Sequence, residues 1–108
     1  MSNLSLNDPS LLETRGYVNG QWVSGASTFA VTNPATGETI ALVADLGVAN
    51  TTQAIDAAFA AKTAWAAWTG KERAGILRKW FDLLVANADD LATILTAEMG
   101  KPWAEAHG

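Results

Sequence analysis

The 108-residue sequence has no cysteine and a single histidine, His107. The absence of cysteine excludes disulfides, thiolate metal sites and cysteine nucleophiles within these residues. His107 lies one residue before the end, and the sequence places no catalytic or metal-binding partner beside it, so we interpret it as a tail residue. The nine glycines never take the spacing of a G-x-G-x-x-G turn or a P-loop. These residues therefore predict no catalytic group and no phosphate cradle.

Charged residues are also few, at 17% of the chain, and the formal net charge is −4. Because no basic cluster is present, nucleic acid and anionic membrane surfaces are not expected as partners. No apolar run reaches the roughly 18 residues that cross a bilayer. Residues 1–16 carry acids and a proline in place of the apolar core of a signal peptide. The chain is therefore expected to be cytoplasmic, and its 49% hydrophobic residues indicate a globular fold.

The first half of the chain predicts two short β-hairpins. Asn19-Gly20 lies between two apolar runs, and this dipeptide favours a hairpin because both residues tolerate positive φ. We therefore expect a hairpin over residues 16–23. Two β-prone runs, 28–32 and 39–43, flank an Asn-Pro-Ala-Thr-Gly turn and predict a second hairpin.

The second half predicts three amphipathic helices, because the hydrophobic period rises from two to about 3.6. The first helix is expected over residues 51–68, with Asn50 and Gln53 resembling a capping box. Thr69 and Glu72 form a clearer capping box that begins the second helix. One apolar stripe of the second helix is expected to face a core. Its residues are Leu77, Trp80, Phe81 and Leu84.

A third helix is expected after Asn87, with Gly100 ending it. Asp89 and Asp90 lie in its first turn, where carboxylates interact favourably with the helix dipole. We interpret these two acids, and likewise Glu98 and Glu105, as structural residues instead of acid–base catalysts.

The pattern as a whole predicts an α+β fragment, two short hairpins followed by three helices. Residues 1–15 are expected to form an N-terminal arm, and residues 16–108 the front of a larger domain. Pro102 begins a further helix that the chain leaves unfinished, and a helix of two turns is not self-sustaining. Trp65 and Trp68 are expected to cover a partner surface. No basic residues are interleaved with the tryptophans, so a stacking platform for nucleic acid lacks its electrostatic half.

Four segments resemble the N-terminal segment of the NAD(P)-dependent aldehyde dehydrogenases: residues 16–23, 31–38, 65–78 and 98–106. Within that family, residues 6–12 and 71–81 are most similar to succinate-semialdehyde dehydrogenase. The resemblance implies that the fragment belongs to an α/β aldehyde dehydrogenase fold.

For the parent protein the resemblance implies oxidation of succinate semialdehyde to succinate with NAD or NADP, through a cysteine thiolate. The family's thiolate, general base, oxyanion donor and dinucleotide site come from later sequence, so the segment alone is expected to be inactive and to bind no cofactor. The implied partner is the remainder of the dehydrogenase chain, in a parent that forms a homo-oligomer.

The resemblance also implies one metal site, a monovalent cation held by main-chain carbonyls. The matching positions are Val31, Thr32 and Glu98, although many family members carry Asp where Glu98 stands. The alternative interpretation is that these are ordinary turn and helix-end residues. Trp103 and His107 depart from the family pattern, which expects a smaller apolar residue and a basic one.

Three hypotheses of function follow from the sequence. The chain is the N-terminal part of a dehydrogenase, of the succinate-semialdehyde or another aldehyde dehydrogenase subfamily. Alternatively, it is a free-standing, non-catalytic interaction module that docks on an intact dehydrogenase. The third hypothesis is a degenerate product of a truncated gene that never folds stably.

Overall fold

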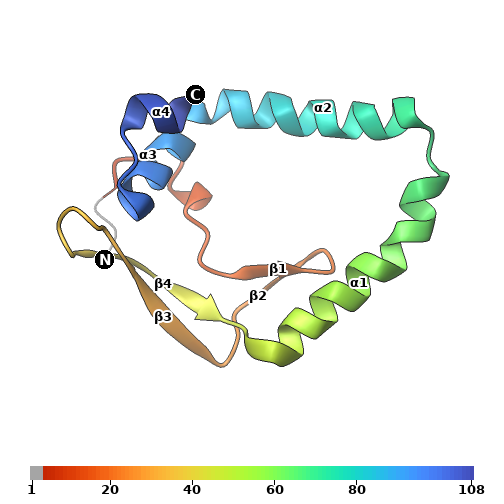
Figure 1. Ribbon diagram of the computed structural model, residues 1–108, viewed down its shortest axis with the longest axis horizontal. Helices are drawn as coiled ribbons and strands as arrows, with labels where there is room; N and C mark the ends of the chain where they lie inside the picture. The colour runs from red at the N-terminus through yellow and green to blue at the C-terminus, as the bar shows by residue number, and fades with distance from the viewer. Residues whose placement is uncertain (1–3) are drawn as a thin grey trace.

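The computed structural model describes residues 4–108, in which four short strands precede four helices (Figure 1). Residues 1–3 of the expected arm, 1–15, lie outside the described residues. A 3₁₀ turn, η1, comes before the strands. The elements are η1 (Pro9–Leu11), β1 (Gly16–Val18), β2 (Gln21–Val23), β3 (Ser27–Thr32), β4 (Thr39–Asp45), α1 (Gly47–Ala67), α2 (Gly70–Ala86), α3 (Ala88–Met99) and α4 (Trp103–His107).

Both predicted hairpins are confirmed, as two separate antiparallel pairs. In the first pair, Tyr17 faces Trp22 across the strands, with ring centroids 4.8 Å apart in an edge-on arrangement. Asn19 and Gly20 take φ values of 49° and 77°, the positive values that this turn requires.

The second hairpin is closed by the Asn-Pro-Ala-Thr-Gly turn. The Asn33 amide donates to the Glu38 carbonyl at 2.8 Å, and Gly37 takes a φ of 76°. Between the Val31–Ala41 and Thr32–Thr39 pairs, Ile40 is one extra residue on β4. This β-bulge accompanies the burial of Ile40, which is only 5% exposed.

The start of the first helix was predicted wrongly. α1 begins at Gly47, four residues before the expected start, and no side chain caps it. Asn50 and Gln53 lie inside the helix, so their capping box does not form. Gly47 has a φ of 69°, which lets the chain turn into the helix directly after β4.

The start of the second helix and the bounds of the third are confirmed. The Thr69 hydroxyl accepts from the Glu72 amide at 3.1 Å, and the Glu72 carboxylate accepts from the Thr69 amide at 2.9 Å. α3 begins after Asn87 and ends at Gly100, whose φ of 78° is left-handed. Pro102 is the N-cap of α4, one position before the first helical residue.

A small core lies where α3 packs on the β3–β4 hairpin, and we call this region the α3 corner. Ile40 and Ala41 of β4 meet Ala97 of α3, and all three are at most 6% exposed. Four partly buried apolar side chains complete the cluster: Leu4, Leu12, Val31 and Val43. The bulged hairpin thus places its buried residues against one face of α3.

The two long helices, α1 and α2, are different, and we call them the α1–α2 limb. Neither helix has a buried residue, and in Figure 1 they extend away from the α3 corner around an open centre. The radius of gyration is 16.6 Å, against about 13 Å for a compact chain of this length. The prediction that Trp80 lies in a core is wrong for this chain, since Trp80 is 61% exposed and no described element covers it.

Candidate functional site

The three predicted cation ligands lie in or beside the α3 corner. Val31 is half-buried against the core, and Thr32 ends β3. Glu98 lies in the last turn of α3 and its side chain is exposed. A Cβ on Gly100 would lie 3.2 Å from Cγ of Pro34, so the end of α3 directly abuts the turn that follows Thr32.

Main-chain oxygens are the available ligands at this corner. The Glu98 carbonyl has no intrahelical partner, because the chain leaves α3 at left-handed Gly100 and the last carbonyls of a helix lie beyond its hydrogen-bond ladder. The C-terminal end of α3 also carries the negative end of the helix dipole. Within residues 4–108, no group of three or more Asp, Glu or His side chains forms a metal cluster. Carbonyl oxygens suit hard cations, whereas soft metals prefer thiolate ligands.

A cavity of about 330 Å³ lies beside these residues, between the turn after β3 and the end of α3. Asn33 lines one side of it, and Thr96 and Gly100 line the other. The Thr96 hydroxyl is buried without a hydrogen-bond partner in the described part of the chain. A buried hydroxyl without a partner is energetically costly, so a further polar group that formed a hydrogen bond with Thr96 would be stabilised at this corner.

His107 has partners that the sequence did not indicate. Its Nε2 lies 2.9 Å from Oδ1 of Asp89, and its ring lies 4.8 Å from the ring of Trp103. Trp103 in turn donates from Nε1 to the Thr93 hydroxyl at 3.3 Å. The separation of 18 residues between His107 and Asp89 hides this contact from sequence inspection. These contacts fasten α4 onto α3, and no nucleophile stands beside the pair among the described residues.

Asp90 also has a role that sequence reasoning missed. Its side chain is buried, at 4% exposed, and its two carboxylate oxygens accept from the amides of Asn7 and Asp8, each at 2.8 Å. The interpretation of these aspartates through the helix dipole is therefore sufficient only for the exposed neighbour, Asp89. Asp90 ties the N-terminal segment to the start of α3, because charge-assisted hydrogen bonds to buried carboxylates are strong.

None of these arrangements supplies the groups that an oxidation requires. The chain has no thiol, and the His107–Asp89 pair is exposed and serves α4. None of the helices in residues 4–108 is long and apolar enough to span a membrane.

A model of the aldehyde dehydrogenase family matches residues 22–108. The chain belongs to this family. The fold agrees: the aldehyde dehydrogenase of Brucella melitensis biovar abortus 2308 superposes with a TM-score of 0.92 and 58% identity over 97% of this chain. The expected fold class, an α+β segment of the aldehyde dehydrogenase fold, is therefore confirmed.

Two further relatives are similar to this aldehyde dehydrogenase segment. The succinate-semialdehyde dehydrogenase of Burkholderia pseudomallei is 54% identical over 96% of the chain, with a TM-score of 0.91. A 3-sulfolactaldehyde dehydrogenase of Pseudomonas putida is 50% identical over 97% of the chain. The chain spans about 22% of the length of each of these three proteins.

Relatives in the family use nicotinamide cofactors. An indole-3-acetaldehyde dehydrogenase that matches this chain was solved with NAD⁺, and a matching Escherichia coli succinate-semialdehyde dehydrogenase is named for NADP⁺. Both cofactors therefore occur among proteins similar to this one.

Proposed function

We propose that this chain is the N-terminal part of an NAD(P)-dependent dehydrogenase that oxidises small aldehydes bearing an acidic group, with succinate semialdehyde as the foremost substrate. The observation that supports it most is the 54% identity to a succinate-semialdehyde dehydrogenase over 96% of the chain. The related 3-sulfolactaldehyde enzyme acts on another aldehyde with an anionic group, so the shared substrate chemistry is an aldehyde beside a negative charge.

In this reaction the aldehyde and water give the carboxylate, and a hydride passes to the oxidised nicotinamide with release of two protons. The cofactor supplies the hydride acceptor, NAD⁺ or NADP⁺. This segment contributes scaffold: Asp90 fixes the arm, and α3 fixes the β3–β4 hairpin. Because it lacks a thiol, we propose that the 108 residues alone are inactive and bind no cofactor.

The proposal includes a division of the chain into an arm, residues 1–15, and a domain part, residues 16–108. It also includes a cytoplasmic, homo-oligomeric parent protein in which the remainder of the dehydrogenase is the main partner. The backbone bond from the Ala44 amide to the Thr14 carbonyl, at 2.8 Å, supports the end of the arm as a segment laid along β4.

The test is to co-express the 108-residue chain with the part of the Burkholderia pseudomallei enzyme outside its matched 22%. We expect reduction of NAD⁺ or NADP⁺ with succinate semialdehyde only when both pieces are present. The two pieces assayed separately are the controls. Turnover by the 108 residues alone would refute the proposal, and so would a soluble assembled pair without turnover.

We further propose a monovalent cation held by the carbonyls of Val31, Thr32 and Glu98. The unpaired Glu98 carbonyl and the negative helix end support it. Gly100→Ala disturbs the left-handed end of α3, which sets the direction of the Glu98 carbonyl. In the assembled pair, potassium is expected to raise the melting temperature of the wild-type protein and to have less effect on the variant. An equal response of both would count against the site.

A further inference from the structure

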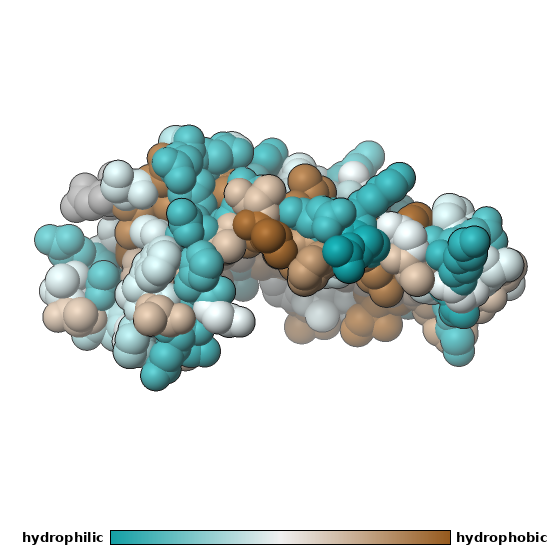
Figure 2. Space-filling view, turned by 90° about the horizontal axis from the view of Figure 1, so that it is seen from above, coloured by the Kyte–Doolittle hydropathy of each residue, from teal (hydrophilic) through white to brown (hydrophobic). Residues whose placement is uncertain are grey.

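The apolar face of α2 is unpaired in the described chain. Leu77, Trp80, Phe81 and Leu84, which we call the α2 stripe, are between 45% and 61% exposed. Their spacing of i, i+3, i+4 and i+7 places them on one side of the helix. Figure 2, seen from above, shows the opposite, outer face of α2 and α4, on which hydrophobic side chains are interrupted by hydrophilic ones. A soluble helix with such a stripe normally buries it.

The exposed surface is large enough for a permanent interface. The chain exposes 7832 Å², whereas a compact monomer of its mass, 11.3 kDa, exposes about 5,700 Å². The difference of about 2,100 Å² lies within the range, on the order of 1,000–2,500 Å² per partner, that obligate interfaces bury. The α1–α2 limb, which has no buried residue, is the natural source of this excess.

One charged residue lies within the stripe. Arg73 precedes Leu77 by four residues and Trp80 by seven, so it shares their side of the helix. It is half-buried, yet its guanidinium has no hydrogen bond or ion pair with any residue of 4–108. Arg15 and Arg78, by contrast, each pair with a carboxylate. An arginine surrounded by apolar side chains requires an acidic partner when the face is covered.

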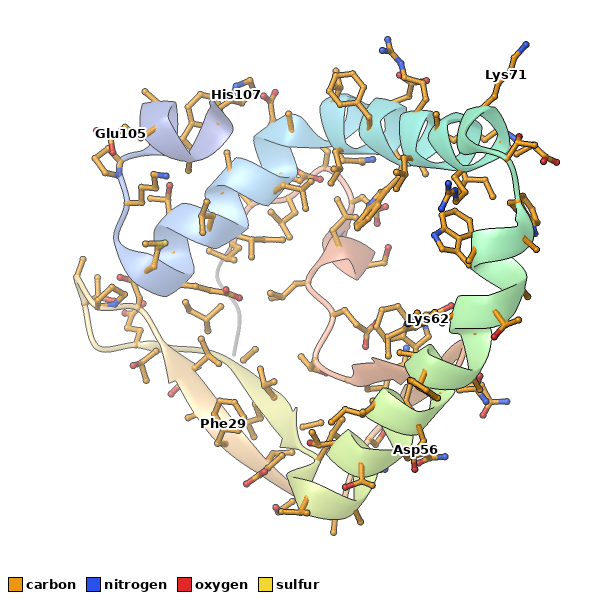
Figure 3. All side chains as sticks on the ribbon, turned by 45° about the vertical axis from the view of Figure 1, so that its right-hand side comes forward. Phe29, Asp56, Lys62, Lys71, Glu105 and His107 are labelled. Carbon is orange, nitrogen blue, oxygen red and sulfur yellow. The ribbon has the colours of Figure 1, made fainter. Side chains whose placement is uncertain are left out.

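The orientation of the stripe follows from Lys71. In Figure 3 the Lys71 side chain, in the first turn of α2, points away from the hairpins. Trp80 follows nine residues later, which is two and a half turns, so it lies on the opposite side of the helix. Trp80, with Leu77 and Leu84 close to it around the helix, therefore lies on the side of α2 that is turned toward the hairpins in Figure 1.

We propose that the α2 stripe is the docking surface for the rest of the dehydrogenase fold, and that a carboxylate of that body pairs with Arg73. The inference rests on the proposed function. The matched relatives have more than three-quarters of their length outside the region that this chain matches, which supplies a body of sufficient size. The remaining body therefore places apolar side chains against Leu77, Trp80 and Leu84, and an acidic group against Arg73.

A second copy of this chain fits the stripe poorly. In a twofold contact the stripe would meet itself, because both partners of an isologous interface use the same surface. In a contact centred on the stripe, Arg73 of each copy would lie opposite the C-terminal end of the partner's α2, where the stripe carries no carboxylate. Each guanidinium would then be covered without an acidic partner, which opposes association.

The test uses three aspartate substitutions on α2 in the 108-residue chain, co-expressed with the part of the Burkholderia pseudomallei enzyme outside the matched region. Leu84→Asp and Arg73→Asp change the stripe. Lys79→Asp is the matched control, since Lys79 is exposed on the other side of the same helix. Association is measured by co-purification and titration, and helix content of each variant alone by circular dichroism.

We expect Leu84→Asp and Arg73→Asp each to weaken association by at least about tenfold, because each removes a favourable group and adds a carboxylate to a buried surface. Lys79→Asp is expected to stay within about twofold of wild type. Equal effects of all three variants, or none, would overturn the proposal. Self-association of the 108-residue chain that Leu84→Asp abolishes, without binding to the remaining body, would overturn it in favour of a second copy.

The binding and activity readouts separate this inference from the proposed function. A complex that forms, loses affinity with Leu84→Asp and Arg73→Asp, and yet has no turnover would support the docking surface and refute the function. Turnover and association that both survive these two substitutions would refute the docking surface and leave the function standing.

Discussion

The α3 corner and the α1–α2 limb each contain a helix with an apolar stripe, α3 and α2 respectively, and only the stripe of α3 is packed. In the corner, Ile40, Ala41 and Ala97 are at most 6% exposed, and Asp90 is buried with both oxygens bonded. In the limb no residue is buried. A hydrophobic stripe therefore shows that a helix has a face to bury, but whether it is buried depends on what lies opposite.

The same comparison separates local from tertiary stabilisation. α2 has a complete capping box, and an Arg78–Asp82 pair at 3.4 Å follows it along the helix. Both interactions are local to α2 and exposed to solvent, so they stabilise the helix itself and not its packing. Helices in proteins draw most of their stability from tertiary packing. Without a packing partner, α2 is therefore stabilised mainly by these local interactions.

The sharpest test of this difference compares two isoleucines. Ile40→Ala is expected to reduce the free energy of unfolding by about 2–4 kcal/mol, since Ile40 is 5% exposed. Ile76→Ala on α2, where Ile76 is 42% exposed, is expected to change it by about 0.5 kcal/mol or less. Urea denaturation of the 108-residue chain measures both. Comparable losses would mean that α2 is already packed.

Two neighbouring aspartates provide the next comparison. Asp90→Ala leaves the amides of Asn7 and Asp8 without their acceptors, so a loss of about 2–3 kcal/mol is expected. Asp89→Ala removes only an exposed contact with His107, for which a few tenths of a kcal/mol is expected. Amide hydrogen exchange at Asn7 and Asp8 should accelerate in the Asp90 variant alone. Unchanged exchange there would contradict the anchoring role.

Replacing either of two glycines by alanine is expected to change the free energy of unfolding, in opposite directions. Gly100→Ala places a Cβ at a φ of 78° and within 3.2 Å of Pro34, so a loss of about 1 kcal/mol or more is expected. Gly75→Ala lies in the middle of α2 with open space around it, and a gain of about 0.5–1 kcal/mol is expected from helix propensity. Thermal denaturation of both variants checks the signs. Stabilisation by Gly100→Ala would show that α3 does not end as described.

The smallest effect concerns the cap of α2. Hydrogen bonds from Thr69 hold the pKa of Glu72 below its ordinary value. A carboxylate whose pKa is lowered on folding stabilises the protein above its unfolded pKa, and this stabilisation is lost as pH falls through the folded pKa. The Thr69 backbone N–H is the larger cause and remains in Thr69→Ala, so this variant, which removes only the side-chain contribution, is expected to raise the pKa of Glu72 partly and to reduce the acid-dependent fraying of α2.

The control for this titration is Glu13, whose pKa is lowered by its hydrogen bond to Arg15 and not by Thr69. Side-chain NMR titration follows both carboxyls. If Glu13 moved as much as Glu72 in the Thr69 variant, the shift would come from a global change and not from the cap.

Local features of the fold were predictable from the sequence because short-range chemistry determines them. Asn19-Gly20, the Thr69–Glu72 box and Gly100 each specify a turn, a start or an end through their own backbone requirements. The start of α1 was not predictable, since Gly47 at positive φ turns the chain early and makes the cap unnecessary.

Contacts between distant residues were beyond sequence reasoning. Asp90 accepts hydrogen bonds from the amides of Asn7 and Asp8, which lie 83 and 82 positions earlier in the sequence. The His107–Asp89 contact requires α4 to be folded back on α3. Trp80 was assigned to a core because a periodic stripe predicts burial but not the element that covers it. The three residues of the cation site came from family resemblance and remain a prediction.

The most direct measurement is hydrogen–deuterium exchange of the 108-residue chain, alone and assembled with the remaining body. We predict that β4 and α3 are protected in both states, while amides of α2 exchange fast in the chain alone and become protected on assembly. Protection of α2 equal to that of α3 in the chain alone, with no change on assembly, would contradict the account.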